Sequence, residues 1–245
     1  MNHNKTAVCI GAHPDDVEFS MGGTVAKLCA MGWKVVIIDI TNGEPTPHGS
    51  PEIRKVESAA AARTLGVERI TLPYNNRFLF DTIDARKDIA TIIRIEKPSL
   101  MFVHYPVDAH PDHWAAHKLG MASRFYGKLS KTDMPGERHY TPRIFYFFSV
   151  HLKISPEPDF CVDISDYIQL KFDAAACYQS QFKEVKKKYF KNKNNATNDD
   201  ENHTKVIESF ITGYSRYWGM KTGCEHAEPF FSPEIFTLHD FSSII

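Results

Sequence analysis

The stretch Ala7-Val8-Cys9-Ile10-Gly11-Ala12 runs directly into His13-Pro14-Asp15-Asp16, and this junction decides the fold class of the chain. A short apolar run that ends in turn residues predicts a strand buried on both faces, as in a parallel sheet. A second junction resembles it, because Leu100-Met101-Phe102-Val103 comes shortly before His110-Pro111-Asp112-His113. Both polar strings therefore follow a predicted strand, at the edge where α/β sheets bind ligands.

Further apolar runs occur at 34–40, 69–72 and 144–148, and longer helix-compatible segments separate them. This alternation predicts an α/β fold with a Rossmann-like, mostly parallel sheet flanked by helices. The best-marked helix spans 51–66, because Pro51 stands at its first position after Ser50 and a glycine ends it.

The C-terminal part predicts an extension of the same domain. A strand is expected at 160–164, followed by a helix that Ser165 or Asp166 begins. The polar stretch 183–203 predicts a solvated loop, since it can bury little apolar surface. We therefore expect residues 1–245 to form a single domain.

Composition narrows the choice of partners. The chain has 245 residues, of which 42% are hydrophobic and 24% charged, and its formal net charge is -1. This balance provides no general attraction to nucleic acid or to an anionic membrane, so we expect a small-molecule partner. No long apolar stretch predicts a signal peptide or a membrane span, and the five scattered cysteines lack a CxxC pair. We expect a cytoplasmic protein with reduced cysteines.

The two polar strings together contain the donors of a catalytic metal site. Such a site needs about three protein ligands and an open position for water. His13 and Asp16 are three residues apart in a turn that enters a helix, and His113 can converge on them from a neighbouring strand end. We predict that these three residues bind the metal. Two histidines and a carboxylate suit both Zn²⁺ and Fe²⁺; hydrolysis, which needs no redox step, favours Zn²⁺.

The remaining residues of the strings have the chemistry of proton transfer. Asp15 is adjacent to a predicted ligand, and we predict that it is the general base for a metal-bound water. His110 is predicted to donate to the oxyanion or to the leaving nitrogen. Asp112 is predicted to accept a hydrogen bond from His110 and so raise its basicity.

Two other histidines offer alternatives. His113 and His117 are four residues apart in a predicted helix, a spacing known from zinc sites, but no HExxH glutamate lies between them. His104 ends a predicted strand and either lines the pocket or is structural. A single His-Pro-Asp string would be interpreted as an ordinary turn; two such strings after two strands favour a metal site.

The motifs resemble those of the LmbE/PIG-L family of zinc-dependent N-acetylglucosaminyl deacetylases. The resemblance rests on the two polar strings, Glu18, and the Arg54-Lys55-Val56-Glu57 segment that precedes an alanine-rich helix. Later segments are most similar to the bacillithiol-pathway branch, which deacetylates N-acetylglucosaminyl malate. These segments are Asp163-Ile164-Ser165, Tyr178-Gln179-Ser180-Gln181-Phe182 and Ala227-Glu228-Pro229-Phe230.

The resemblance implies zinc bound by the three predicted ligands, the predicted base Asp15, and His110 backed by Asp112 for the tetrahedral intermediate. It also implies that Arg54 binds the substrate, a role that the residue type alone would not indicate. Asp108 and the 42–50 loop are further candidates for contacts with sugar hydroxyls. Relatives in the bacillithiol branch assemble into higher oligomers, so a homo-oligomer is an additional expectation.

The predicted reaction is removal of the acetyl group from an N-acetylglucosamine-containing conjugate. Two alternatives remain open. One is a metal-dependent hydrolase of another acylated small molecule, such as an amino-acid conjugate or an O-acetyl ester. The other is a non-catalytic nucleotide- or sugar-binding domain, which the sequence favours less because the first strand–helix turn lacks GxGxxG and carries two aspartates.

Overall fold

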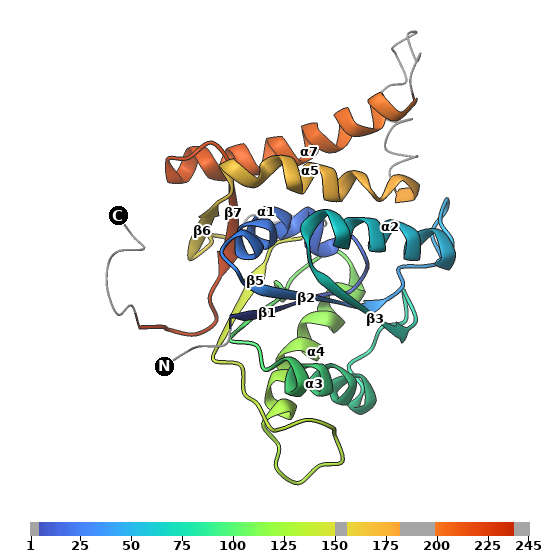
Figure 1. The fold of residues 1–245 in the computed structure, drawn as a ribbon, viewed down its shortest axis with the longest axis vertical. Coiled ribbons are helices and arrows are strands. Elements are labelled where there is room, and N and C mark those ends of the chain that lie inside the picture. The colour runs from blue at the N-terminus through green and yellow to red at the C-terminus, as the bar shows by residue number, and fades with distance from the viewer. Residues whose placement is uncertain (1–4, 150–155, 182–198, 238–245) are drawn as a thin grey trace.

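A seven-stranded sheet lies at the centre of the computed structural model, which describes residues 5–149, 156–181 and 199–237 (Figure 1). Its strand order is β3-β2-β1-β4-β5-β7-β6. The strands are β1 (Thr6–Gly11), β2 (Lys34–Thr41), β3 (Glu68–Tyr74), β4 (Leu100–His104), β5 (Arg143–Phe147), β6 (Phe160–Asp163) and β7 (Ala227–Phe231). Strands β1 to β5 pair in parallel, whereas β7 is antiparallel to both β5 and β6. The predicted mostly parallel sheet is confirmed.

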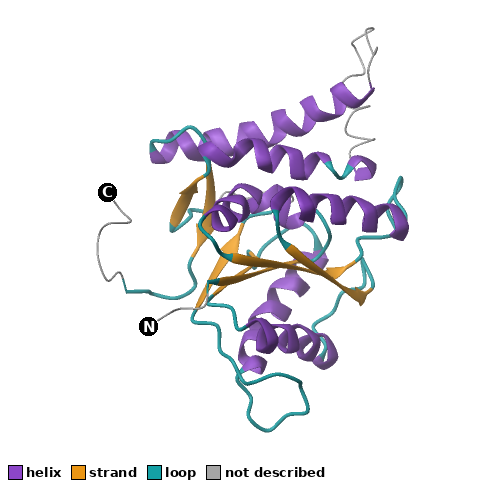
Figure 2. Cartoon of the chain, viewed as in Figure 1, coloured by secondary structure: helices purple, strands orange, loops and turns teal. Residues whose placement is uncertain are grey.

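Helices cover both faces of this sheet (Figure 2). Helices α1 and α2 lie on one face and α3 and α4 on the other, while α5 and α7 form a further layer outside α1 and α2. The helices are α1 (Asp16–Ala30), α2 (Pro51–Leu65), α3 (Ile83–Glu96), α4 (Pro111–Gly127), α5 (Ile168–Ala176) and α7 (Asp199–Thr222), with short 3₁₀ helices η1 (Ser165–Tyr167) and η2 (Gln179–Gln181). The Rossmann-like arrangement of the prediction is therefore observed.

The central strand β1 explains why the apolar runs are continuous. All six of its residues are buried. Successive side chains point to opposite faces, so Val8 and Ile10 belong to the core cluster that includes α3 and α4 residues. Ala7 and Cys9 belong to the cluster on the α1 face. A strand covered by helices on both faces needs apolar residues at every position.

Helix α2 begins and ends at the residues that the sequence predicted. The Ser50 hydroxyl accepts a hydrogen bond from the Ile53 backbone N–H at 3.2 Å, and Pro51 occupies the first helical position. At the other end Gly66 adopts a left-handed conformation with φ 70°. Glycine reaches that conformation without a Cβ clash and ends the helix there.

Helix α1 has an internal kink. Met21 leaves helical geometry with φ -142° and ψ 25°. The backbone N–H groups of Gly23 and Thr24 donate to the two carboxylate oxygens of Glu228, at 3.0 and 2.7 Å. Lys171 Nζ donates to the same carboxylate at 2.5 Å. The second half of α1 therefore begins at the buried ion pair between Lys171 of α5 and Glu228 of β7.

The C-terminal part differs from the prediction in two respects. Residues 165–167 form η1, so the helix that Ser165 or Asp166 was expected to begin starts only at Ile168, as α5. Helix α7 begins at Asp199, so the last five residues of the predicted 183–203 loop are helical. Residues 182–198 lie outside the described part, and the loop prediction for 183–198 stays untested.

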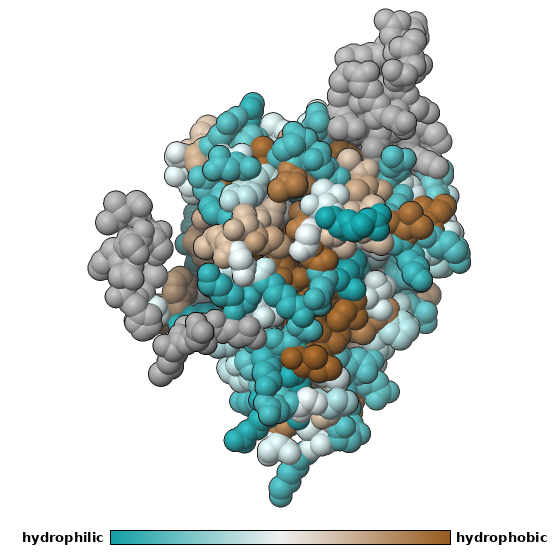
Figure 3. Space-filling view, viewed as in Figure 1, coloured by the Kyte–Doolittle hydropathy of each residue, from teal (hydrophilic) through white to brown (hydrophobic). Residues whose placement is uncertain are grey.

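The face of the molecule in Figure 3 is largely hydrophilic, and its hydrophobic areas are interrupted by polar side chains. None of the described helices combines the length and apolarity needed to cross a membrane.

Candidate active site

The site residues lie at the carboxyl ends of β1 and β4. These strands are neighbours in the sheet but are far apart in sequence, because β2 and β3 continue from β1 in one direction and β4 and β5 in the other. Ligands bind where the strand order reverses in this way, since the loops there leave the sheet on opposite sides. The topology thus brings the two polar strings together.

The first string forms the turn between β1 and α1. His13 and Asp16 are 8% and 6% exposed, and the His13 backbone N–H donates to Asp16 Oδ2 at 2.8 Å. Asp15 is the residue before α1 and has φ 105° and ψ -28°. Three of the described non-glycine residues have a positive φ: Asp15, Arg77 and Lys97. The value at Asp15 is the largest. Such backbone outliers concentrate at functional sites.

The second string begins α4. His110 is the N-cap, and its Nδ1 accepts a hydrogen bond from the Asp112 backbone N–H at 3.2 Å. Pro111 occupies the first helical position, and His113 is fully buried. Because Nδ1 is the acceptor, a neutral His110 carries its proton on Nε2.

The three predicted ligands converge. Asp16 Oδ1 lies 3.2 Å from His113 Nε2, and Asp16 Oδ2 lies 3.4 Å from His13 Nδ1. The imidazole centroids of His13 and His113 are 5.5 Å apart. The carboxylate of Asp16 therefore lies between His13 and His113, the other two predicted metal ligands.

Within the described residues, two overlapping clusters have donor atoms within 4.8 Å of one another and can hold a metal ion. They are His13-His110-His113 and Asp16-His104-His113. The predicted trio draws on both clusters. His104 Nε2 accepts a hydrogen bond from the Ala12 backbone N–H at 3.1 Å, so its lone pair is already engaged. This contact favours His13 over His104 as a ligand.

The carboxylates of the site favour positive charge on His13 and His113. Although burial opposes it, hydrogen bonds to Asp112 and Asp16 raise the pKa of His13 to about 9. Burial likewise opposes charge on His113, but Asp16 and Asp108 raise its pKa to about 10. The same carboxylates would stabilise a divalent cation, whose ligands must be deprotonated. Imidazole and carboxylate donors in a cation-favouring pocket fit a divalent metal.

Asp108, predicted to contact substrate, lies behind His113. Its Oδ2 is 3.1 Å from His113 Nδ1 and accepts a hydrogen bond from the Ser149 hydroxyl, while Oδ1 accepts from the His110 backbone N–H at 2.8 Å. Asp108 is only 7% exposed. A carboxylate on the far nitrogen of a ligating imidazole fixes its orientation and increases its basicity. The geometry is that of support for the predicted metal ligand His113 rather than of a sugar contact.

Asp112 also differs from expectation. Its Oδ2 is 3.1 Å from His13 Nε2 and accepts from the Arg77 backbone N–H at 2.7 Å. His110 instead meets the backbone N–H of Asp112, because an N-cap side chain satisfies the unpaired donors of the first helical turn. Burial, with the charges of His13 and His113, lowers the pKa of His110 to about 4. The charge of Asp112 does raise the pKa of His110, as expected, but these lowering effects outweigh it.

Asp15 and Arg54 form an ion pair beside the predicted metal ligands. Arg54 Nη1 and Nη2 both donate to Asp15 Oδ2, at 3.2 and 3.3 Å, and Nη2 also donates to the Pro14 carbonyl. The Arg54 side chain is 2% exposed and that of Asp15 is 22% exposed. Burial raises the pKa of Asp15 to about 6, against the lowering effect of Arg54. The carboxylate is therefore mostly ionised at neutral pH and close to the pKa that suits a base.

His117 has a structural contact. Its Nδ1 donates to the His104 carbonyl at 2.8 Å, and it belongs to neither of the metal-compatible clusters formed by the described residues. Sequence reasoning missed Ser149, which hydrogen-bonds both Asp108 and His113. No motif marks a serine at the end of β5; only its place beside β4 in the sheet indicates it.

Several known proteins resemble this chain in sequence. Residues 8–123 match the family model PIG-L, described as GlcNAc-PI de-N-acetylase. The chain is 29% identical to the diacetylchitobiose deacetylase of Thermococcus kodakarensis, over 96% of this chain and 86% of that protein. It is 30% identical to an uncharacterized deacetylase of Escherichia coli, over 50% and 69%. A probable N-acetyl-alpha-D-glucosaminyl L-malate deacetylase of Bacillus cereus is 27% identical, over 69% and 80%.

Solved structures share the fold. A conserved protein of Thermus thermophilus superposes with a TM-score of 0.80 at 31% identity, covering 95% of this chain and 97% of that one. The 4-carboxy-2-hydroxymuconate hydratase of Pseudomonas putida has a TM-score of 0.75 at 17% identity, covering 96% and 98%. A protein named as a hydratase thus shares the fold, so the fold by itself does not determine the reaction.

Proposed function

The chain belongs to the PIG-L family of deacetylases, and from this membership we propose that it is a metal-dependent hydrolase of an N-acetylglucosamine-containing conjugate. The products are acetate and a free amino sugar. The observation that carries the proposal is the convergence of His13, Asp16 and His113 beside Asp15, at the point where the strand order reverses.

His13, Asp16 and His113 would hold the metal, and we propose Zn²⁺. Their donor set also suits Fe²⁺, but amide hydrolysis requires a Lewis acid and no change of oxidation state. A divalent ion bound there would polarise the acetyl carbonyl and lower the pKa of a bound water to about 7. Asp108 and Ser149 support the proposal from behind His113, because they hold its ring in place.

Asp15 is the proposed general base. Its carboxylate is partly exposed, its pKa of about 6 leaves it ionised at neutral pH, and Arg54 fixes one of its oxygens. A carboxylate in this state can take a proton from the attacking water as the new C–O bond forms. The same proton can then pass to the nitrogen as the C–N bond breaks, so the amine leaves neutral and Asp15 is ionised again.

His110 is the proposed donor to the developing oxyanion. Its Nδ1 is occupied by the Asp112 backbone N–H, so in the neutral ring Nε2 bears the hydrogen. Burial and its histidine neighbours lower its pKa to about 4, and the ring is therefore neutral at pH 7. A donor already fixed by an N-cap contact needs no reorganisation when negative charge develops on the substrate.

The named substrates of the relatives set the substrate class. The Thermococcus kodakarensis protein is named for diacetylchitobiose and the Bacillus cereus protein for N-acetylglucosaminyl malate. Both compounds are N-acetylglucosamine joined to a second group, and we propose this shared chemistry for the present chain. The bacillithiol-pathway conjugate is the finer proposal, with Arg54 as its predicted substrate contact. A single domain, cytoplasmic location and a homo-oligomer remain predictions from the sequence.

Acetate release tests the proposal. The purified protein is incubated with N-acetylglucosamine, N,N′-diacetylchitobiose or N-acetylglucosaminyl malate, before and after removal of metal by a chelator. We expect release from at least one conjugate, its loss on chelation and its return with Zn²⁺. Asp15→Asn serves as the matched control, because it should bind metal but release little acetate. Metal-dependent release from an N-acetylated amino acid or an O-acetyl ester, with none from the sugars, would contradict the proposed substrate class.

A further inference from the structure

The turn after α5, residues Tyr178 to Gln181, contacts the site from a distant part of the chain. The Ser180 backbone N–H and hydroxyl donate to the two carboxylate oxygens of Glu57 on α2, at 2.7 and 2.8 Å. Gln181 Nε2 donates to the Thr46 hydroxyl at 3.3 Å, in the loop that leads into α2. The turn is thus attached to α2 and to the loop that precedes it.

Tyr178 is the inner residue of this turn and is fully buried. Its hydroxyl donates to Glu18 Oε1 at 2.9 Å and accepts from Arg69 Nη1 at 2.8 Å. Arg69 also pairs with Asp39 at 3.1 Å. Two charged partners therefore anchor the hydroxyl, and neither of them belongs to the proposed reaction.

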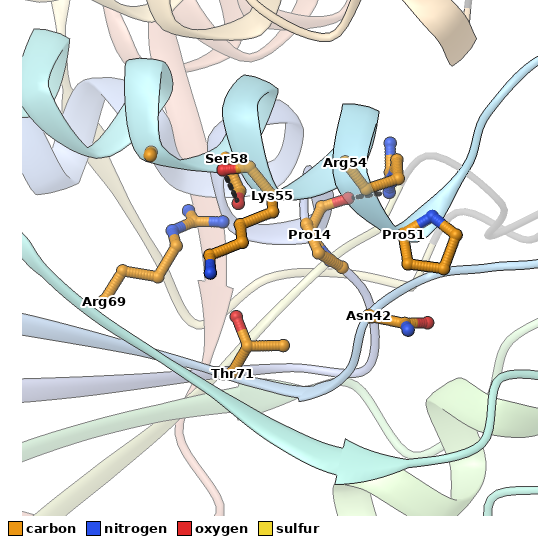
Figure 4. A pocket seen from close by; sticks show the side chains of 9 residues that line it. Pro14, Asn42, Pro51, Arg54, Lys55, Ser58, Arg69 and Thr71 are labelled. Atoms are coloured by element: carbon orange, nitrogen blue, oxygen red, sulfur yellow. Dashed lines mark hydrogen bonds between the residues drawn. The ribbon is translucent and has the colours of Figure 1, made fainter.

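The face of this ring meets Arg54. The Arg54 Cζ atom lies 5.3 Å from the centroid of the Tyr178 ring, within the range of a cation–π contact. Figure 4 shows Arg54 projecting from α2 and bonded to Pro14, with Arg69 farther along the underside of the helix. Arg54 also donates twice to Asp15 Oδ2. The guanidinium thus contacts both an aromatic face and the proposed base.

We propose that the Tyr178–Gln181 turn is a positioning element that fixes Arg54, and through it the carboxylate of Asp15. Tyr178 and Glu57 are positioning residues in this scheme, since neither touches the reacting atoms. The inference rests on the proposed role of Asp15, and it gives a function to Glu57, three residues after Arg54 on α2. Arginine has a long, flexible side chain, and the Tyr178 ring restricts it in addition to the hydrogen bonds to Asp15 and to the Pro14 carbonyl.

Kinetics of three variants test the proposal. Tyr178→Leu removes the aromatic face, whereas Tyr178→Phe keeps it. Because a misplacement of about 1 Å can cost about 100-fold in rate, we expect Tyr178→Leu to lower kcat about 10- to 100-fold with KM changed less than about threefold. Tyr178→Phe should restore most of kcat. Phe230→Leu, which removes a fully buried ring elsewhere in the core, is the matched control and should keep kcat.

A double-mutant cycle separates positioning from general packing. If Tyr178 acts through Arg54, adding Tyr178→Leu to Arg54→Gln should lower kcat by less than about threefold beyond Arg54→Gln alone, because coupled residues are non-additive. Additive losses would overturn the proposal, as would wild-type kcat in a folded Tyr178→Leu protein. Should Tyr178→Leu fail to fold, Glu57→Gln, which removes a carboxylate from Ser180, replaces it in the cycle with the same expectations.

A readout without turnover keeps this inference distinct from the proposed function. In ¹⁵N NMR of the arginine side chains, an Arg54 held by Tyr178 and Asp15 should show separate Nη signals; Arg54→Gln identifies them by their absence. We expect these signals to merge in Tyr178→Leu and to persist in Tyr178→Phe. Unchanged signals in Tyr178→Leu would refute the positioning role. Absence of acetate release by the wild type would refute only the proposed reaction.

Discussion

Replacing Lys171 by methionine should destabilise the protein strongly, because it leaves the Glu228 carboxylate buried without its cation. Lys171 and Glu228 are 2% and 1% exposed, and Lys171 Nζ lies 2.5 Å from Glu228 Oε1. Breaking such a pair from one side typically costs about 3–5 kcal/mol. Against a total stability of about 5–15 kcal/mol, this is a large fraction. The hydrogen bonds from Gly23 and Thr24 to the same carboxylate place the damage at the kink of α1.

Urea unfolding followed by circular dichroism measures the loss as a lower transition midpoint at constant m-value. The control is Lys87→Met, which breaks an ion pair to Asp133 between groups that are 37% and 77% exposed and should cost less than about 1 kcal/mol. Lys171→Met with Glu228→Gln should be more stable than Lys171→Met alone, since a neutral amide is less costly to bury. A loss below about 1 kcal/mol for Lys171→Met would refute this reasoning.

Three further predictions concern the site and its support. Asp15→Asn should lower kcat about 10²- to 10⁴-fold with unchanged metal content by elemental analysis; a smaller loss would remove Asp15 from the base role. Asp108→Asn should weaken metal affinity about 10- to 100-fold in chelator competition, since Asp108 supports His113; unchanged affinity would contradict that support. A Cβ at Gly23 would lie 2.7 Å from the Ile164 Cβ, so Gly23→Ala should cost about 1–3 kcal/mol in urea unfolding. Gly213→Ala, with open space on the exposed face of α7, should stabilise by about 0.5–1 kcal/mol, and the opposite order of these two variants would contradict the packing argument.

The elements that carry the site were accessible from the sequence, because their signals are local. The strand before His13 is apolar throughout, and Ser50, Pro51 and Gly66 mark the limits of α2. The convergence of His13, Asp16 and His113 also followed, since parallel strands place their carboxyl ends on one edge of a sheet. Their roles in binding metal stay predictions.

The contacts that complete the site were not accessible in the same way. Whether Asp112 faces His110 or His13 depends on which group caps α4, and that choice is made by the packed structure. The contact of Asp108 with His113 depends on the path of the loop after β4. Long-range partners such as Glu228, which caps the second half of α1 from β7, leave no periodic pattern in the sequence.

The positive φ of Asp15 lowers the stability of the folded protein at the residue proposed as the base. With φ 105° the backbone is in a region that glycine enters freely and side-chain-bearing residues enter at a cost of about 1–3 kcal/mol. A chain selected for folding alone would gain by having glycine there. In an Arg54→Gln background, where no buried guanidinium is left without its carboxylate, we expect Asp15→Gly to raise the melting temperature while removing the proposed base. The aspartate at this position thus lowers stability in favour of activity, and the increase in melting temperature of the glycine variant would measure that loss of stability.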